Sequence, residues 1–264
     1  MAVMDEFRKE REAIKKAPFK EKRKYFWDYY KWYCIWGLVI LIGLGSLIYD
    51  MATNKDTSLY VLFLNSMDAT DDYGETFIHD FMETAGMNPK KETVLIDNSL
   101  YVDLGYSENM AQNENTLTAV QKISLFLATG DMDIMTTDSA IFDHYAYKYI
   151  FHDLREFLPE GVFEKYEPYM YYIDYAVVRA EAEAGVNAEE EIPHPTPTKP
   201  DEMEEPIPVG IYLTAIPDTF YDSYKFKEVP PILGFIRSGE HPEAALAFFQ
   251  YIMEGTCQPL TTEK

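Results

Sequence analysis

An apolar run of 18 residues without a charge, from Trp32 to Tyr49, constrains this chain more than any other feature. A helix rises about 1.5 Å per residue, so a helix of this length spans roughly 27 Å, close to the hydrocarbon thickness of a bilayer. Aromatic residues crowd the start of the run, and such rings prefer the headgroup layer of a membrane. The sequence therefore predicts a transmembrane helix over residues 32–49.

Three other interpretations of the run fit less well. A cleaved signal peptide has a shorter apolar run and a small-residue cleavage site, which Asp50–Thr53 does not provide. A lipoprotein needs a cysteine just past the run, where none stands. A helix of a protein core would not carry the basic and aromatic collar that precedes Trp32. A membrane span is the interpretation that fits both the run and its flanks.

Charge is divided unequally around the run. Residues 1–31 carry ten Lys/Arg and six Asp/Glu, a net charge of +4, so the total of −22 leaves −26 for the rest of the chain. Positively charged flanks stay in the cytoplasm, which predicts a cytoplasmic N-terminus, a single pass through the cell membrane and an extracytoplasmic C-terminal domain. An outer domain this acidic repels phosphate, so nucleic acid is not expected among its partners.

The two cysteines are predicted not to pair. Cys34 lies in the apolar run and Cys257 near the C-terminus, so the membrane would separate them. The outer domain then has no internal disulfide and depends on its core for stability. Exported domains of this kind are common in bacteria that lack strong periplasmic oxidation, which favours a bacterial host.

Beyond the run, residues 50–57 are predicted to form a polar tether and residues 58–264 one domain. Apolar segments typical of buried strands alternate with amphipathic segments typical of helices. The expected strands are 58–65, 93–97 and 132–135, and the helices start at Asp71 or Asp72, at Asn115 or Thr116, and at Asp138 or Ser139. The inward positions of the second helix are predicted to be Leu117, Val120, Ile123, Ser124 and Leu127. This order predicts an α/β fold with a mainly parallel sheet covered by helices.

Residues 180–208 differ sharply from the rest of the domain. Glutamates without aromatic residues occupy the stretch up to Glu191, and six prolines follow between Pro193 and Pro208. Such a stretch buries too little apolar surface to order itself, so an exposed, extended loop is predicted. The domain continues after it, with strands expected at 209–215 and 232–236 and a helix at 241–254.

The sequence contains no recognisable catalytic or metal-binding pattern. None of the five histidines stands in a metal-ligand spacing such as H-E-x-x-H, and there is no G-x-S-x-G, P-loop or G-x-G-x-x-G. Asp131, Asp133 and Asp138 imitate the start of a calcium loop, but Thr136 and Phe142 stand where glycine and glutamate are required. We therefore expect a protein that is not an enzyme and that uses no metal and no cofactor.

Two segments resemble the extracellular solute-binding proteins of ABC transporters, a type II periplasmic-binding-protein-like family. Leu127–Leu158 contains Gly130-Asp131-Met132-Asp133-Ile134, followed by an expected helix and by Asp153-Leu154. Leu233–Glu254 (LGFIRSGEHPEAALAFFQYIME) is similar to the strand and helix late in that family. Together with the strand at 58–65, the resemblance covers about half of the outer domain.

The resemblance implies two lobes with a ligand cleft between them. This chain departs from that pattern, because its middle section, Pro159–Pro208, is short and half of it is the acidic loop. The second lobe is therefore expected to be reduced. A membrane helix also replaces the lipidated cysteine that usually anchors the family.

Ligands of open parallel sheets bind beyond the carboxyl ends of the strands, near helix N-termini. The predicted ligand-binding residues at that edge are Asn65, Ser66, Thr136, Thr137, Asp138 and Ser139. Stacking faces would come from Tyr171, Tyr172 and Tyr212. The alternative, which we favour slightly, is that the polar groups cap helices and the tyrosines belong to the core or the surface.

These observations predict a non-catalytic, membrane-anchored, extracytoplasmic protein that is solute-binding-like. It would bind a small solute or a partner protein at the cell surface, the partner being an ABC permease or another envelope protein. One alternative is an envelope interaction or scaffold module that kept the fold and lost the ligand. The other is a cell-wall hydrolase, for which no catalytic constellation is visible.

Overall fold

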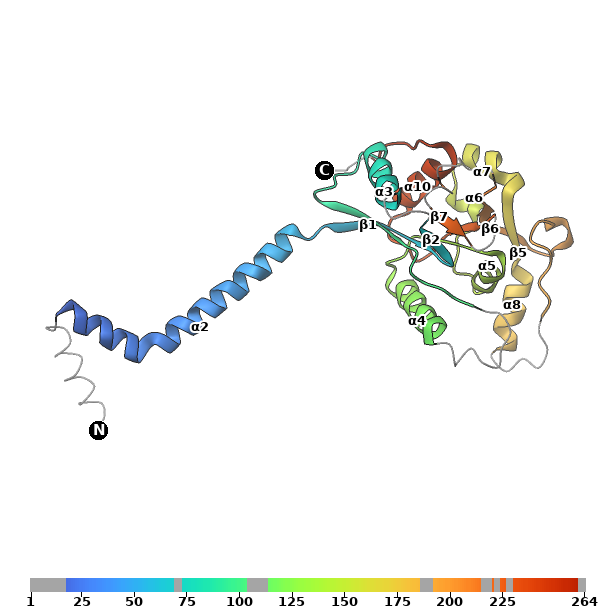
Figure 1. The fold of residues 1–264 in the computed structure, drawn as a ribbon. Coiled ribbons are helices and arrows are strands. Elements are labelled where there is room, and N and C mark those ends of the chain that lie inside the picture. The colour runs from blue at the N-terminus through green and yellow to red at the C-terminus, as the bar shows by residue number, and fades with distance from the viewer. Residues whose placement is uncertain are drawn as a thin grey trace. The chain divides into compact units, whose positions relative to one another are not determined.

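The computed structural model describes residues 18–68, 73–103, 114–185, 192–214, 220, 224–226 and 230–260. The chain forms two compact units, Met1–Asn54 and Lys55–Lys264. The described part of the first unit is one long helix, and the second unit holds the strands and the remaining helices (Figure 1).

The helix of the first unit, α2 (Phe19–Thr53), has 35 residues and contains the predicted span. A stretch of 20 residues, Tyr30–Tyr49, has a mean hydropathy of 1.9, and none of it is buried among the residues that the structure describes. This helix is therefore long and apolar enough to cross a membrane. It continues to Thr53 because no proline or glycine follows Tyr49, and β1 begins at Asp56, so the tether expected at 50–57 shrinks to Asn54 and Lys55.

The second unit is built on a six-stranded sheet. Its strand order is β3 (Glu92–Asp97), β1 (Asp56–Phe63), β4 (Ile134–Thr137), β8 (Ile232–Phe235), β6 (Pro206–Tyr212) and β5 (Met170–Asp174). β1 runs parallel to both β3 and β4, whereas β8, β6 and β5 follow in antiparallel pairings. A second, two-stranded antiparallel sheet joins β2 (Ser66–Asp68) to β7 (Tyr224–Phe226).

The prediction of a mainly parallel sheet is confirmed for one half and wrong for the other. Parallel neighbours need a long crossover, which helices α3 (Tyr73–Thr84) and α4 (Glu114–Thr129) supply between β1, β3 and β4. The later strands lack this strand-helix alternation, and β5, β6 and β8 pair antiparallel. β5 was not expected from the sequence, nor was the ribbon of β2 and β7. The sheet is therefore mixed.

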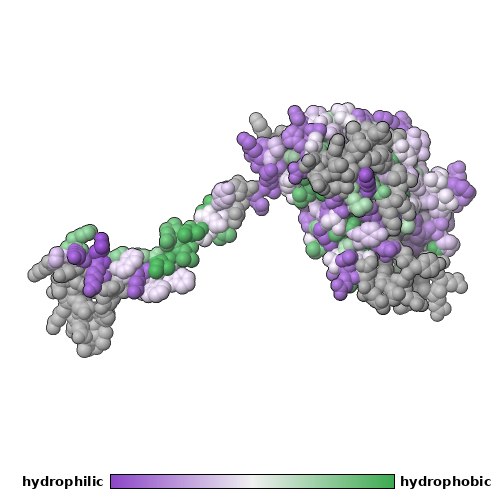
Figure 2. Space-filling view, viewed as in Figure 1, coloured by the Kyte–Doolittle hydropathy of each residue, from purple (hydrophilic) through white to green (hydrophobic). Residues whose placement is uncertain are grey.

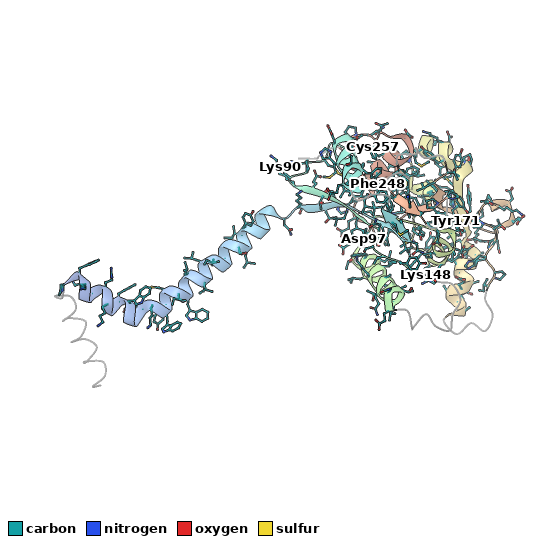
Figure 3. The ribbon with its side chains drawn as sticks, viewed as in Figure 1. Lys90, Asp97, Lys148, Tyr171, Phe248 and Cys257 are labelled. Atoms are coloured by element: carbon teal, nitrogen blue, oxygen red, sulfur yellow. The ribbon has the colours of Figure 1, made fainter. Side chains whose placement is uncertain are left out.

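Helices cover both faces of the sheet, as predicted (Figure 1). The first core lies between α3, α10 (Pro242–Glu254) and the side of β1 that carries Leu59, Val61 and Phe63. The second core lies between α4, α5 (Ser139–Ala146) and the opposite side of β1. Phe248 belongs to the first core and Tyr171 to the second (Figure 3). The shorter helical segments are α6 (Leu154–Phe157), α7 (Glu160–Tyr166), η2 (Glu167–Tyr169), α8 (Tyr175–Ala184) and η3 (Pro200–Glu202).

Helix α4 lies where the sequence places it, and its inward face agrees with the prediction in part, because Ile123 is buried and Val120 and Leu127 pack against the second core. Thr116, Ala119 and Ile123 are its buried residues, whereas Leu117 is 47% exposed and Ser124 is exposed. Thr116, Ala119 and Ile123 are three or four residues apart, so they share one face of the helix, and this face excludes Leu117 and Ser124. Capping of α3 by Asp71 or Asp72 concerns residues outside those that the structure describes.

The acidic, proline-rich segment is more structured than predicted. Helix α8 extends to Ala184, and β6 already begins at Pro206. Between them, the carbonyl of Pro197 accepts a 2.9 Å hydrogen bond from the amide of Tyr172. This contact puts residues of the segment along strand β5, at the edge of the sheet, where prolines protect a strand from pairing with other chains.

The two segments that carry the family resemblance contact each other. The buried Asp133 carboxylate accepts hydrogen bonds from the amides of Tyr60 and His241, both at 2.8 Å. Gly130 has φ +80, and a Cβ there would stand 2.7 Å from the carbonyl oxygen of Ser238. These residues tie the start of β4 to the N-terminus of α10. The Gly130–Asp133 pattern therefore has a structural role that requires no ligand.

Candidate functional site

The polar residues predicted at the carboxyl ends of β1 and β4 do come together. The two strands pair in parallel up to Phe63 and Thr136, so their ends lie side by side. Asn65 follows β1 in a left-handed conformation (φ 59), which asparagine tolerates better than most residues. Its side-chain amide donates to the carbonyl of Val102 at 2.8 Å and its oxygen accepts from the amide of Val102 at 2.8 Å.

Asp138 occupies the same place after β4, and both of its carboxylate oxygens are engaged. Oδ1 accepts the amide of Ile141 at 3.1 Å and so caps α5, while Oδ2 accepts Nδ2 of Asn65 at 3.0 Å. Asn65 and Asp138 are each only 6% exposed. The sequence therefore predicted the pairing of the two strand ends correctly, and the predicted N-cap is confirmed. In this structure the pair joins β1 to α5.

The hydroxyl groups of the predicted site do not form one binding surface. Thr136 and Thr137 are fully buried. Because neighbouring residues of a strand point to opposite faces of the sheet, Thr136 faces the first core and Thr137 faces the second. Neither hydroxyl has a hydrogen-bond partner among the described residues. Ser66 donates to the carbonyl of Phe63 at 2.8 Å, and Ser139 is exposed in the first turn of α5.

The three predicted tyrosines divide in the same way. Tyr171 and Tyr212 lie on the second core, with ring centroids 5.7 Å apart, whereas Tyr172 packs against the first core. Tyr212 pairs with Ile232, which also pairs with Thr137, so Tyr212 and Thr137 share one end of the sheet. The hydroxyl of Tyr171 donates to Asp143 at 2.6 Å. Of the predicted set, only Asn65, Thr137, Asp138, Tyr171 and Tyr212 have a common side.

A polar cluster that the sequence did not predict lies beside these tyrosines. The His194 cluster consists of Asp143 on α5, Tyr147 after α5, Glu181 on α8 and His194 in the proline-rich segment. Nδ1 of His194 is 2.5 Å from Asp143 and Nε2 is 2.9 Å from Glu181. The ring also stacks on Tyr147 with centroids 3.6 Å apart. The cluster connects the segment that precedes β6 to two helices.

The geometry of the His194 cluster fits an imidazolium. Each ring nitrogen faces a carboxylate, and only the doubly protonated ring donates from both nitrogens. Burial lowers the pKa of His194, but the hydrogen bonds from the ring to Asp143 and Glu181 outweigh it and raise the pKa to about 8. Burial and the Asp143 hydrogen bond likewise raise the pKa of Tyr171, so its hydroxyl remains protonated and donates.

A second histidine, His144 on α5, has a pKa that is shifted in the opposite direction. Burial, together with the neighbouring charge of Lys148, lowers the pKa of His144, and the two side chains are 2.6 Å apart. Lys148 is labelled in Figure 3. Burial lowers the pKa of this lysine as well. Among the described residues, no group of three or more His, Cys, Asp or Glu side chains is arranged to hold a metal ion. The chemistry of this region is therefore that of ion pairs and hydrogen bonds that join elements.

No sequence signal identifies the His194 cluster. His194 lies between two prolines, and its carboxylate partners are 51 and 13 residues away in the chain. The chain has 45 Asp and Glu residues, so the sequence does not single out Asp143 and Glu181 as the partners of His194. Only the return of the proline-rich segment to the sheet edge brings the three side chains together.

The stability of the folded domain is expected to fall as the pH rises from 6.5 to about 8. A group whose pKa is raised by folding stabilises the protein below its unfolded pKa and loses that contribution as the pH passes its folded pKa. His194→Gln should lower the free energy of unfolding below pH 6.5 and remove this pH dependence. His79→Gln, at an exposed position of α3, should keep it.

Denaturant unfolding at a series of pH values measures this effect. The same slope between pH 6.5 and 8 in His194→Gln and in the wild type would show that His194 does not carry it.

Comparison with known proteins gives no relative. No protein-family model matches the chain, and no curated protein and no solved structure shows a significant match.

Proposed function

We propose that this chain is a single-pass membrane protein whose folded domain is a non-catalytic binding module outside the cell. The observation that carries the proposal is the stretch Tyr30–Tyr49 of α2, 20 residues long and without contact to a protein core. Figure 2 draws it as an apolar stretch in the middle of the helix. Apolar surface of this extent requires cover, and a helix of this length fits the hydrocarbon layer.

The unequal charge supports a cytoplasmic N-terminus. Residues 1–31 carry +4 and the remainder −26, and basic flanks are retained on the cytoplasmic side. The acidic domain Lys55–Lys264 would then lie outside. Because both cysteines are free, its stability there would depend on its core.

We infer that the domain binds a partner protein of the envelope rather than a small solute. The groups expected to hold a solute, Asn65 and Asp138, are buried and satisfy each other's hydrogen bonds. Tyr171 donates to Asp143. To bind a ligand, these side chains would first have to break their present hydrogen bonds. Each buried polar atom left without a partner costs about 1–3 kcal/mol of free energy.

Solute binding in association with an ABC permease is the second candidate. It is favoured by the gathering of polar side chains at the carboxyl ends of β1 and β4, and by the buried Thr137 hydroxyl, which has no partner among the described residues. A cell-wall hydrolase has less support. Both ring nitrogens of His194 already contact carboxylates, so this imidazole has no free nitrogen to serve as a base.

A panel of solutes is expected to leave the melting temperature of the purified protein unchanged. A solute present at 100 times its Kd would stabilise the folded state by about 2.7 kcal/mol, an effect that thermal melts detect readily. Asp138→Ala should destabilise the domain by about 1–3 kcal/mol, because α5 loses its cap and Asn65 a partner. Ser139→Ala, at the adjacent exposed position, should have little effect.

Sugars, amino acids, oligopeptides and oxyanions form the panel. A solute that raises the melting temperature of the wild type but not of Asp138→Ala would overturn the choice of a protein partner and establish the second candidate.

A further inference from the structure

Helix α2 is longer than a membrane span requires. It begins at Phe19, 11 residues before the apolar stretch that starts at Tyr30. At about 1.5 Å per residue, these residues extend roughly 16 Å, which is more than the headgroup layer on one side of a bilayer. Because the helix is continuous, this N-terminal part is held at the membrane surface by the span itself.

Basic side chains follow one face of this N-terminal part. The basic stripe consists of Lys20, Arg23, Lys24 and Lys31. Arg23 and Lys24 lie three and four residues after Lys20, and Lys31 lies seven after Lys24, so the four residues share one side of the helix. Three of them, together with Trp27, line one hollow on the helix surface. Figure 2 shows hydrophilic side chains gathered near this end of α2. Phe19–Lys31 carries five basic and two acidic residues, a net charge of +3.

Aromatic side chains occupy a neighbouring face of the same part. Phe26 stacks on Tyr30 with centroids 5.4 Å apart, and Tyr30 contacts Tyr33 at 6.3 Å. Trp27 is 61% exposed and stands beside the basic stripe. Aromatic rings of this kind settle at the boundary between headgroups and acyl chains. Long lysine and arginine side chains on the neighbouring face can then extend toward the lipid phosphates while their stems lie along the helix.

We propose that the basic stripe binds the head groups of anionic phospholipids in the leaflet that faces the N-terminus. The inference rests on the proposed membrane span. Positive side chains and lipid phosphates are complementary, and each Lys or Arg near an anionic surface adds to the attraction. Lipid is the occupant that the geometry favours, because the span holds the stripe next to the headgroup layer.

The test uses the full-length chain in micelles of a neutral detergent, titrated with phosphatidylglycerol or with phosphatidylcholine. All three tryptophans of the chain, Trp27, Trp32 and Trp36, lie in α2, so tryptophan emission reports on this helix alone. We expect phosphatidylglycerol to bind preferentially. Combined Lys20→Gln, Arg23→Gln and Lys24→Gln should weaken its binding on the order of a hundredfold.

Two further variants control for charge and chemistry. Removal of three exposed charges from the folded domain, by Lys90→Gln, Lys91→Gln and Lys225→Gln, should leave lipid binding unchanged. Lys20→Arg with Lys24→Arg should retain it. Inorganic phosphate should not compete at concentrations equal to those of the lipid, since a free ion lacks the acyl chains that hold the head group at the stripe.

The outcomes separate the lipid inference from the proposed span. Equal affinity for both lipids, or unchanged binding by the triple glutamine variant, would overturn the inference. Alkaline carbonate treatment of membranes tests the span independently. Release of the wild type from those membranes would overturn the span and, with it, the inference.

Discussion

Ile134→Asp is expected to prevent folding of the domain formed by Lys55–Lys264. Ile134 is fully buried on β4, a strand that lies between β1 and β8. It pairs with Val61 on one side and Phe235 on the other, and its side chain belongs to the first core. An aspartate there would bury a carboxylate without a partner, at a cost of several kcal/mol against a total stability of about 5–15 kcal/mol.

The matched control is Leu95→Asp on β3. Leu95 undergoes the same change of side chain, but it lies on an edge strand and is 43% exposed. This variant should fold, with a loss of about 1 kcal/mol or less. Circular dichroism and thermal melts of both variants make the comparison. A cooperative melt of Ile134→Asp near the wild-type temperature would contradict the central position of β4.

The sequence predicted well wherever a local pattern and a crossover helix act together. The continuous apolar run at 58–65 becomes β1, buried on both faces, and Asp138 caps α5 as its position after a strand suggests. The helix at 241–254 becomes α10, with its apolar face in the first core. In each case the pattern of neighbouring residues indicates the element correctly.

Features that depend on distant contacts were missed. Tyr171 and Tyr172 were predicted to share a site, but they are consecutive residues of β5, a strand not recognised in the sequence, and therefore face opposite sides of the sheet. The direction of β8 and the residues around His194 depend on segments far apart in the chain. Local patterns carry no information on such pairings.

The candidate site could be predicted only in part for the same reason. The carboxyl ends of parallel strands meet at one edge, which brought Asn65 and Asp138 together as expected. That the two side chains would satisfy each other, and that Thr136 and Thr137 would point to opposite cores, follows from packing. The resemblance to solute-binding proteins remains a proposal, because no family model, curated protein or solved structure matches the chain.

The second large effect that we expect concerns the side of the membrane on which each part of the chain lies. The proposed span separates the basic N-terminal part of α2 from the acidic domain, so a reagent that cannot cross membranes should reach only one of them. Lys90 in the domain and Lys22 in α2 are both exposed and suit cysteine labelling. The natural Cys34 and Cys257 are both free, and would first be replaced by serine.

Labelling of Lys90→Cys and Lys22→Cys by a membrane-impermeant maleimide on intact protoplasts tests the central claim most directly. We predict that Lys90→Cys reacts on intact protoplasts and that Lys22→Cys reacts only after permeabilisation. Reaction of Lys22→Cys alone on intact protoplasts would contradict the orientation. Equal reaction of both variants, or of neither, would contradict the single membrane span.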